Sequence, residues 1–155
     1  MPTTIYTLGY QGLSLDEYIA LLKEHPISLV IDVRAVAWSH KPGFAKNAMQ
    51  SGLREVGTDY LHLQSAGNPF RKDEDGENVM MKYRSYLQKH PECLDRIEAE
   101  IQQSAKKDTS ICLTCFEKAP QDCHRSIIAE FLLARSPRLY VIHLGAESDQ
   151  LSLIS

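Results

Sequence analysis

The chain has 155 residues, of which 43% are apolar and 24% charged, and its 17 Lys+Arg and 20 Asp+Glu give a formal net charge of −3. These values are typical of a globular protein and exclude a collagen, an intrinsically disordered chain and a disulfide-rich miniprotein. No apolar run approaches the ~20 residues of a membrane span, and the charge provides no general basic field for nucleic acid. We therefore expect one cytoplasmic domain over residues 1–155, with no membrane partner.

Short β-branched runs alternate along the chain with longer amphipathic stretches. The runs predict strands over residues 4–8, 28–33, 59–63, 110–115 and 139–144. The stretches predict helices over residues 15–24, 45–55, 79–89, 92–106 and 122–135. Ser14 and Glu17 have the spacing of a capping box at the start of the first helix. This alternation predicts an α/β fold with three layers, α/β/α, around a mainly parallel sheet of about five strands.

The densest set of reactive side chains follows the fourth expected strand and consists of Cys115, Glu117, Cys123, His124 and Arg125. Ligands bind at the carboxyl edge of such sheets, which is where this segment lies. With Asp122 as the expected cap, the next three residues fall in a first helical turn, where free N–H groups and Arg125 favour an anion. Cys115 or Cys123 is the candidate nucleophile, and His124 or Glu117 exchanges protons.

The remaining cysteines have a simpler interpretation. Cys112 and Cys115 match a C-x-x-C pattern, but residues three apart in a strand point to opposite faces, so we expect no redox pair or zinc knuckle there. Cys93 and Cys112 are expected to pack as small apolar residues.

A metal site is the less favoured alternative. Cys115, Glu117, Cys123 and His124 offer four plausible ligands, which would suit a metal-dependent hydrolase. Sequence neighbours rarely both bind one ion, and the flanking ligand pairs typical of zinc sites are missing. We therefore expect no metal ligands and no evident cofactor.

Further ligand-binding candidates follow the first three expected strands and are Gly9, Asp32, Arg34, Gly67, Asn68 and Arg71. Gly9 permits close approach of a ligand, and Asp32 either orients Arg34 or forms with it an ion pair that shapes the loop. Residues 33–54 contain four basic and no acidic residues, with Trp38 among them. This basic strip supports a module that binds nucleic acid or a nucleotide, with structural cysteines.

Four segments of the sequence resemble the domain-of-unknown-function 488 family. They are TLGYQG (7–12), LVIDVRAVAWSHKPGF (29–44), YLHLQSAGNP (60–69) and ICLTCFEKAPQDCHRSIIAEFL (111–132). The positions that match the family's pattern are Gly9, Asp32, Arg34, Pro42, Phe44, Gly67, Asn68, Cys115, Glu117, Cys123, His124 and Arg125. The chain departs from that pattern at Ala37 and at Ser65–Ala66, both in expected loops. The resemblance assigns the site residues and supplies no activity.

The order of elements is also loosely similar to that of rhodanese-type sulfurtransferases and cysteine phosphatases. These enzymes too have an Ile-Asp-Val-Arg strand early in the chain and a strand, a cysteine-containing loop and a helix later. Those enzymes place Cys and Arg about six residues apart, whereas Cys115 and Arg125 here are ten apart, so the likeness is one of layout. The leading hypothesis is a thiol-dependent transferase or hydrolase whose Cys/His/Arg site binds a small anionic or nucleotide-like ligand.

Overall fold

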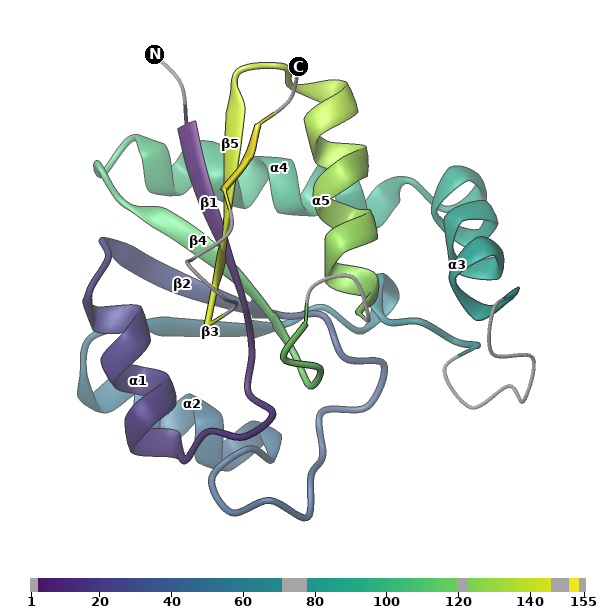
Figure 1. The fold of residues 1–155 in the computed structure, drawn as a ribbon. Coiled ribbons are helices and arrows are strands. Elements are labelled where there is room, and N and C mark those ends of the chain that lie inside the picture. The colour runs from purple at the N-terminus through teal and green to yellow at the C-terminus, as the bar shows by residue number, and fades with distance from the viewer. Residues whose placement is uncertain (1–2, 71–77, 120–122, 146–150, 154–155) are drawn as a thin grey trace.

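The strands form one mixed sheet. The computed structural model describes residues 3–70, 78–119, 123–145 and 151–153, and within them six strands lie in the order β3-β2-β4-β1-β5-β6 (Figure 1). The strands are β1 (Thr3–Gly9), β2 (Ile27–Asp32), β3 (Asp59–His62), β4 (Ser110–Cys115), β5 (Leu139–Leu144) and β6 (Leu151–Leu153). β1 to β5 pair in parallel, whereas β6 pairs antiparallel with β5. The expected mainly parallel sheet is confirmed, and β6 is an addition that the sequence analysis missed.

Helices cover both faces of the sheet. They are α1 (Leu15–Lys23), α2 (Lys46–Glu55), α3 (Asn78–Lys89), α4 (Glu92–Ala105) and α5 (His124–Arg135), and the short 3₁₀ helix η1 (Gln64–Ala66) follows β3. Figure 1 shows α1 and α2 on one side of the sheet and α3, α4 and α5 on the other. The two apolar clusters follow the same division. This is the expected α/β/α arrangement.

Alternation along the strands decides which cluster each side chain joins. In β4, Cys112 packs in the cluster of α1 and α2, whereas Leu113 and Cys115 pack in the cluster of α3, α4 and α5. The prediction that Cys112 and Cys115 face opposite sides is therefore confirmed. Cys93 and Cys112 are free and buried, in agreement with a packing role.

The first helix begins as predicted. The Ser14 hydroxyl accepts a hydrogen bond from the Glu17 backbone N–H (3.1 Å), and the Glu17 carboxylate accepts one from the Ser14 N–H (2.9 Å). This capping box satisfies two donors that a helix N-terminus otherwise leaves free. It also fixes where the chain turns after β1.

The chain leaves the two central strands in opposite directions. From β1 it crosses through α1 to β2, and from β4 it crosses through α5 to β5 on the other side. The carboxyl ends of β1 and β4 lie side by side, with Gly9 opposite Cys115. The place where the connections from neighbouring strands diverge is called a topological switch point. It opens a crevice at the edge of the sheet, and ligands bind there in open parallel sheets.

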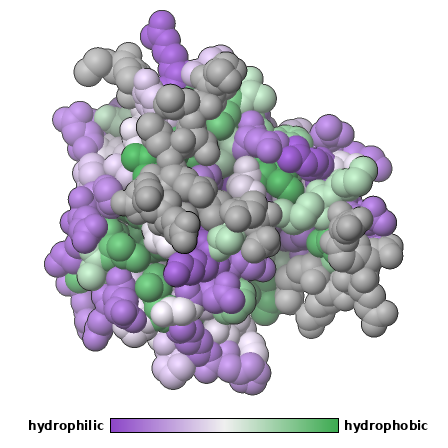
Figure 2. Space-filling model, viewed as in Figure 1, coloured by the Kyte–Doolittle hydropathy of each residue, from purple (hydrophilic) through white to green (hydrophobic). Residues whose placement is uncertain are grey.

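The surface shown in Figure 2 mixes hydrophilic residues with small groups of hydrophobic ones. Within the described residues, no helix has both the length and the apolar character that crossing a membrane requires.

Candidate functional site

A cavity of about 510 Å³ opens at the carboxyl edge of the sheet, beside the switch point. Its lining residues are Tyr10, Arg34, Ala35, Val36, Trp38, Ser39, His40, Lys41, Cys115, Phe116, Glu117 and His124. Four of the predicted site residues are therefore brought together at one cavity: Arg34, Cys115, Glu117 and His124. The cavity lies at the edge of the sheet where the sequence analysis expected a ligand.

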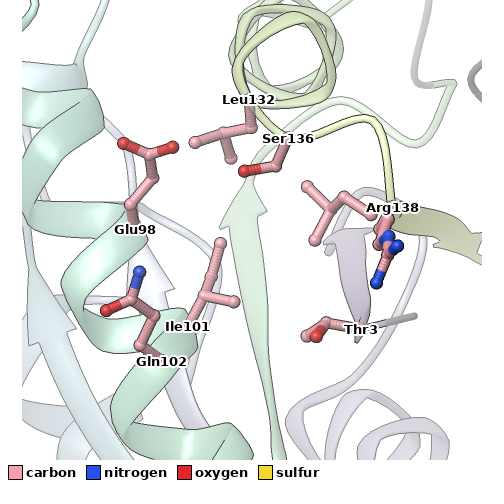
Figure 3. Close-up of a pocket in the computed structure, with 8 residues that line it drawn as sticks. Thr3, Glu98, Ile101, Gln102, Leu132, Ser136 and Arg138 are labelled. Atoms are coloured by element: carbon pink, nitrogen blue, oxygen red, sulfur yellow. The ribbon is translucent and has the colours of Figure 1, made fainter. Parts of the chain in front are cut away.

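A smaller cavity, of about 200 Å³, lies at the amino edge of the sheet. Figure 3 shows Glu98, Ile101 and Gln102 on one helix, with Thr3 and Arg138 on the opposite side of this cavity. Its lining contains neither cysteine nor histidine. The carboxyl-edge cavity is therefore the better candidate for chemistry.

Cys115 and Cys123 are joined by a disulfide bond and both are buried. Cys115 ends β4, and Cys123 is the N-cap of α5, where its sulfur accepts the Arg125 backbone N–H. The cap expected at Asp122 is thus one residue later than predicted, and Asp122 itself lies outside the described residues. A sulfur can take this position because it accepts a weak hydrogen bond. The sequence left open whether Cys115 and Cys123 are a nucleophile, a redox pair, metal ligands or structural, and in this structure they are paired.

Arg125 is completely buried behind the cavity. Its Nε donates to Thr7 Oγ1 (3.2 Å), Nη1 to Cys115 Sγ (3.1 Å) and to the Glu117 carbonyl, and Nη2 to the Lys118 carbonyl (3.0 Å). Burial lowers its pKa to about 10, so the side chain stays protonated at neutral pH. The donors that we expected to bind an anion therefore hold the loop after β4 and contact the sulfur of Cys115.

A buried pair from β1 and β5 holds the other side of this guanidinium. Thr7 Oγ1 lies 2.6 Å from Nδ1 of His143. The Thr7 hydroxyl also accepts from Arg125 and so links the two side chains. Burial and, to a smaller extent, the positive charge of Arg125 together lower the pKa of His143 to about 4. Sequence reasoning missed both residues, although each is a polar residue within an apolar run.

The ring of His124 is oriented toward Cys123. Its Nε2 lies 2.6 Å from the Val33 carbonyl, which can only accept, so Nε2 carries the proton and Nδ1 has a free lone pair. Nδ1 lies 3.8 Å from Cys123 Sγ. Burial lowers the pKa of His124 to about 4, which keeps the ring neutral at pH 7. In the reduced protein, this nitrogen is placed to take the proton of the Cys123 thiol.

Glu117 brings a carboxylate to the same place, with Oε2 3.7 Å from Cys115 Sγ. Cys115, Glu117 and Cys123 have ligand atoms within 4.8 Å of one another, so they are the described residues that could hold a metal ion. The guanidinium of Arg125 lies against one of the two sulfurs and would repel a cation there. The arrangement suits a thiolate better than a metal.

Asp32 and Arg34 form a buried ion pair. Arg34 Nε and Nη2 donate to the Asp32 carboxylate at 2.6–3.0 Å, and Nη1 donates to the Tyr10 hydroxyl (3.1 Å) and the Phe44 carbonyl (2.6 Å). Burial opposes the charge of Arg34, but the Asp32 carboxylate raises its pKa above the usual value. The pair shapes the loop after β2, which was the alternative interpretation of these residues.

The predicted glycines make room for backbone. A Cβ on Gly9 would lie 1.7 Å from the Glu117 carbonyl oxygen, and one on Gly67 would lie 2.3 Å from Cα of Ala35. Asn68 is buried, and its Oδ1 accepts the Phe70 N–H (2.9 Å) in a local turn. These residues position the loops around the cavity. Arg71 lies outside the described residues.

Aromatic and cationic side chains form the rim of the cavity. Trp38 is 58% exposed and Phe116 44% exposed, and His40 and Lys41 lie on the same loop as Trp38. Tyr10, in the floor, contacts the ring of Phe116 edge-on at 5.4 Å. Phe116 and Tyr10 were not predicted as site residues, because an aromatic residue beside a strand is ordinary core composition.

The chain belongs to the family described as Domain of unknown function DUF488, whose model matches residues 14–132. This confirms the resemblance noted in the sequence. Comparison with curated proteins found no match, and neither did comparison with solved structures.

The contact at Gly9 leads to a first prediction. Gly9→Ala should lower the free energy of unfolding by about 2–3 kcal/mol, because the methyl group would overlap the backbone of Glu117. Gly52→Ala is the control, since its methyl would meet only the ends of the Leu15 and Ile19 side chains and helix propensity favours alanine by ~1 kcal/mol. Urea unfolding measures both variants. Equal stability of the two would contradict the close approach.

The buried His143 predicts loss of stability in acid. The pKa of His143 in the folded protein, about 4, lies below its ordinary value of 6.5, so the unfolded chain binds the proton more readily. The contribution of His143 to the free energy of unfolding is therefore complete only above about pH 6.5. Lowering the pH from 7 to 5 should remove about 2 kcal/mol through this group. His143→Asn keeps an acceptor for Thr7 but cannot titrate in this range. Urea unfolding at several pH values should give a shallower pH dependence for this variant, and an unchanged slope would show that His143 is not responsible.

Proposed function

We propose that this member of the DUF488 family is a thiol-dependent enzyme that binds a small anionic, nucleotide-like ligand at the carboxyl edge of its sheet. One observation carries the proposal. Cys115, its neighbour Glu117 and the oriented ring of His124 line the same cavity as Lys41 and the exposed ring of Trp38. A nucleophile, proton carriers, a cation and a stacking surface thus share one enclosed volume.

The rim supplies the contacts for the ligand. The arginines expected to bind the anion donate to protein groups. Lys41 also lines the cavity, and its Nζ lies 5.9 Å from the centre of the Phe44 ring. The planar ring of Trp38 provides a surface for an aromatic base, and Phe116 provides a second one. A phosphate near Lys41 and a base against Trp38 would place the ligand across the mouth of the cavity.

The reactive groups lie on the floor of the cavity, which is formed by Cys115, Glu117 and His124. In the reduced protein, the Arg125 guanidinium beside Cys115 Sγ favours the thiolate, which is the reactive form of cysteine. The Glu117 carboxylate, 3.7 Å from the same sulfur, can accept or return a proton. Cys115 therefore acts as the nucleophile, and it is the member of the disulfide that lines the cavity.

The ligand site predicts a measurable affinity for a nucleoside monophosphate. Adenosine monophosphate should quench the fluorescence of Trp38, the single tryptophan of the chain, and bind more tightly than adenosine or inorganic phosphate. Lys41→Ala should weaken binding by about tenfold or more, the cost of one charge-assisted contact. Lys46→Ala is the matched control, because Lys46 is exposed on α2 and does not line the cavity. Absence of binding, or equal losses in both variants, would refute the ligand assignment.

The thiol part of the proposal is tested separately. In the protein reduced with dithiothreitol, iodoacetamide should modify Cys115 before Cys112, whose thiol lies in a buried strand and has a pKa raised by burial. Adenosine monophosphate should slow modification of Cys115. If all four cysteines reacted at one rate, or none reacted before unfolding, Cys115 would be a packing residue and the proposal would fail.

A further inference from the structure

The Cys115–Cys123 bond joins a sulfur that lines the cavity to one that does not. Both cysteines are buried, but Cys115 lines the cavity, whereas Cys123, the N-cap of α5, is absent from its lining. A substrate in the cavity therefore meets Cys115 first, and Cys123 can reach Cys115 without meeting the substrate. This is the arrangement of an attacking and a resolving thiol.

We propose that this pair reduces the disulfide bond of a small anionic substrate by thiol–disulfide exchange. The inference rests on the proposed function, because it uses the same cavity and the same nucleophile, and it adds the class of reaction and substrate. Reduced protein is the active form, and the disulfide is the state in which a turnover ends. A dithiol reductant returns the protein to the reduced form.

The first step opens the substrate. The Cys115 thiolate attacks one sulfur of R–S–S–R′, the S–S bond breaks, and R′–S⁻ leaves and takes a proton from solvent. A mixed disulfide between Cys115 and R–S remains. Arg125 Nη1, 3.1 Å from Cys115 Sγ, favours the attacking thiolate.

The second step releases the other half of the substrate. His124 Nδ1 takes the proton of the Cys123 thiol, and the resulting thiolate attacks Cys115 Sγ. The mixed disulfide breaks, R–S⁻ leaves and receives the proton from His124, and the Cys115–Cys123 bond forms. Two electrons have passed from the protein dithiol to the substrate, which is now two thiols. Val33 supports this step because its carbonyl holds the proton of His124 on the far nitrogen.

Two variants separate the roles of the sulfurs. Reduced protein is mixed with oxidised glutathione, a small anionic disulfide, and the products are identified by intact mass and peptide mapping. Wild type should end with the Cys115–Cys123 disulfide and no added mass. Cys123→Ser should retain one glutathione on Cys115, and Cys115→Ser should form neither product. Cys112→Ser is the matched control, since this buried cysteine on the same strand lies on the opposite face, and it should behave as wild type.

The role of His124 has its own readout. His124→Gln should leave the first step intact and slow the second by about 10²-fold or more, so that the mixed disulfide on Cys115 accumulates transiently. A thermal unfolding curve shows whether the variant is folded. If it is not, the comparison of Cys123→Ser with Cys115→Ser still decides the proposal.

Several results would overturn the exchange reaction. They are a disulfide that dithiothreitol cannot reduce in the folded protein, a wild type that keeps the mixed disulfide, or equal glutathione uptake by both cysteine variants. Exchange at equal rates with oxidised glutathione and with the cationic disulfide cystamine would refute the anionic substrate. Exchange without binding of adenosine monophosphate would refute the nucleotide-like ligand alone, whereas nucleotide binding without exchange would refute this inference alone.

Discussion

The buried charge of Arg125 is the constraint on which the rest of the site depends. Burying an unpaired guanidinium costs several kcal/mol, so its N–H groups must find acceptors in the protein. The carbonyls of Glu117 and Lys118 provide them only because the loop after β4 folds back over the side chain. That fold brings the loop against β1, where only glycine at position 9 leaves room, and it places the end of β4 beside the start of α5.

The same principle explains why the donors of both arginines are bound to protein groups. Arg34 is paired with Asp32 and donates to the Phe44 carbonyl, just as Arg125 donates to the loop after β4. Each guanidinium organises a loop at the edge of the sheet, and both loops border the cavity. Their charges are already balanced or enclosed by carbonyl dipoles, so the proposed function assigns the attraction for an anion to Lys41 on the rim. The chain has a formal net charge of −3 and therefore no overall attraction for anions, so a site that binds an anion needs a local cation such as Lys41.

The elements were predictable from the sequence, whereas the contacts of the site were not. The apolar runs and the capping box at Ser14 depend on residues close in the chain, and for that reason the strands and helices could be predicted from their patterns. The alternation rule also placed Cys112 and Cys115 on opposite faces. The bond between Cys115 and Cys123 and the enclosure of Arg125 depend on how the loop after β4 folds back, which local pattern does not encode. The contact of Arg125 with Thr7 depends on the order of the strands. A motif can therefore identify reactive residues without indicating which groups their hydrogen-bond donors contact.

The site divides into a fixed floor and a more open rim, and this division matches the two requirements of the proposed chemistry. The sulfurs and His124 are held by main-chain carbonyls and by a buried arginine, so their separations do not depend on the ligand. Exchange between thiols needs such fixed geometry, because the three sulfurs must align for each displacement. The rim residues Trp38 and Lys41 lie on the longer connection between β2 and α2, and neither side chain belongs to the two apolar clusters. The proposal thus assigns the reaction class to the ends of β1 and β4 and the start of α5, and the ligand preference to the loop after β2. A change on that loop can alter the ligand without altering the reaction.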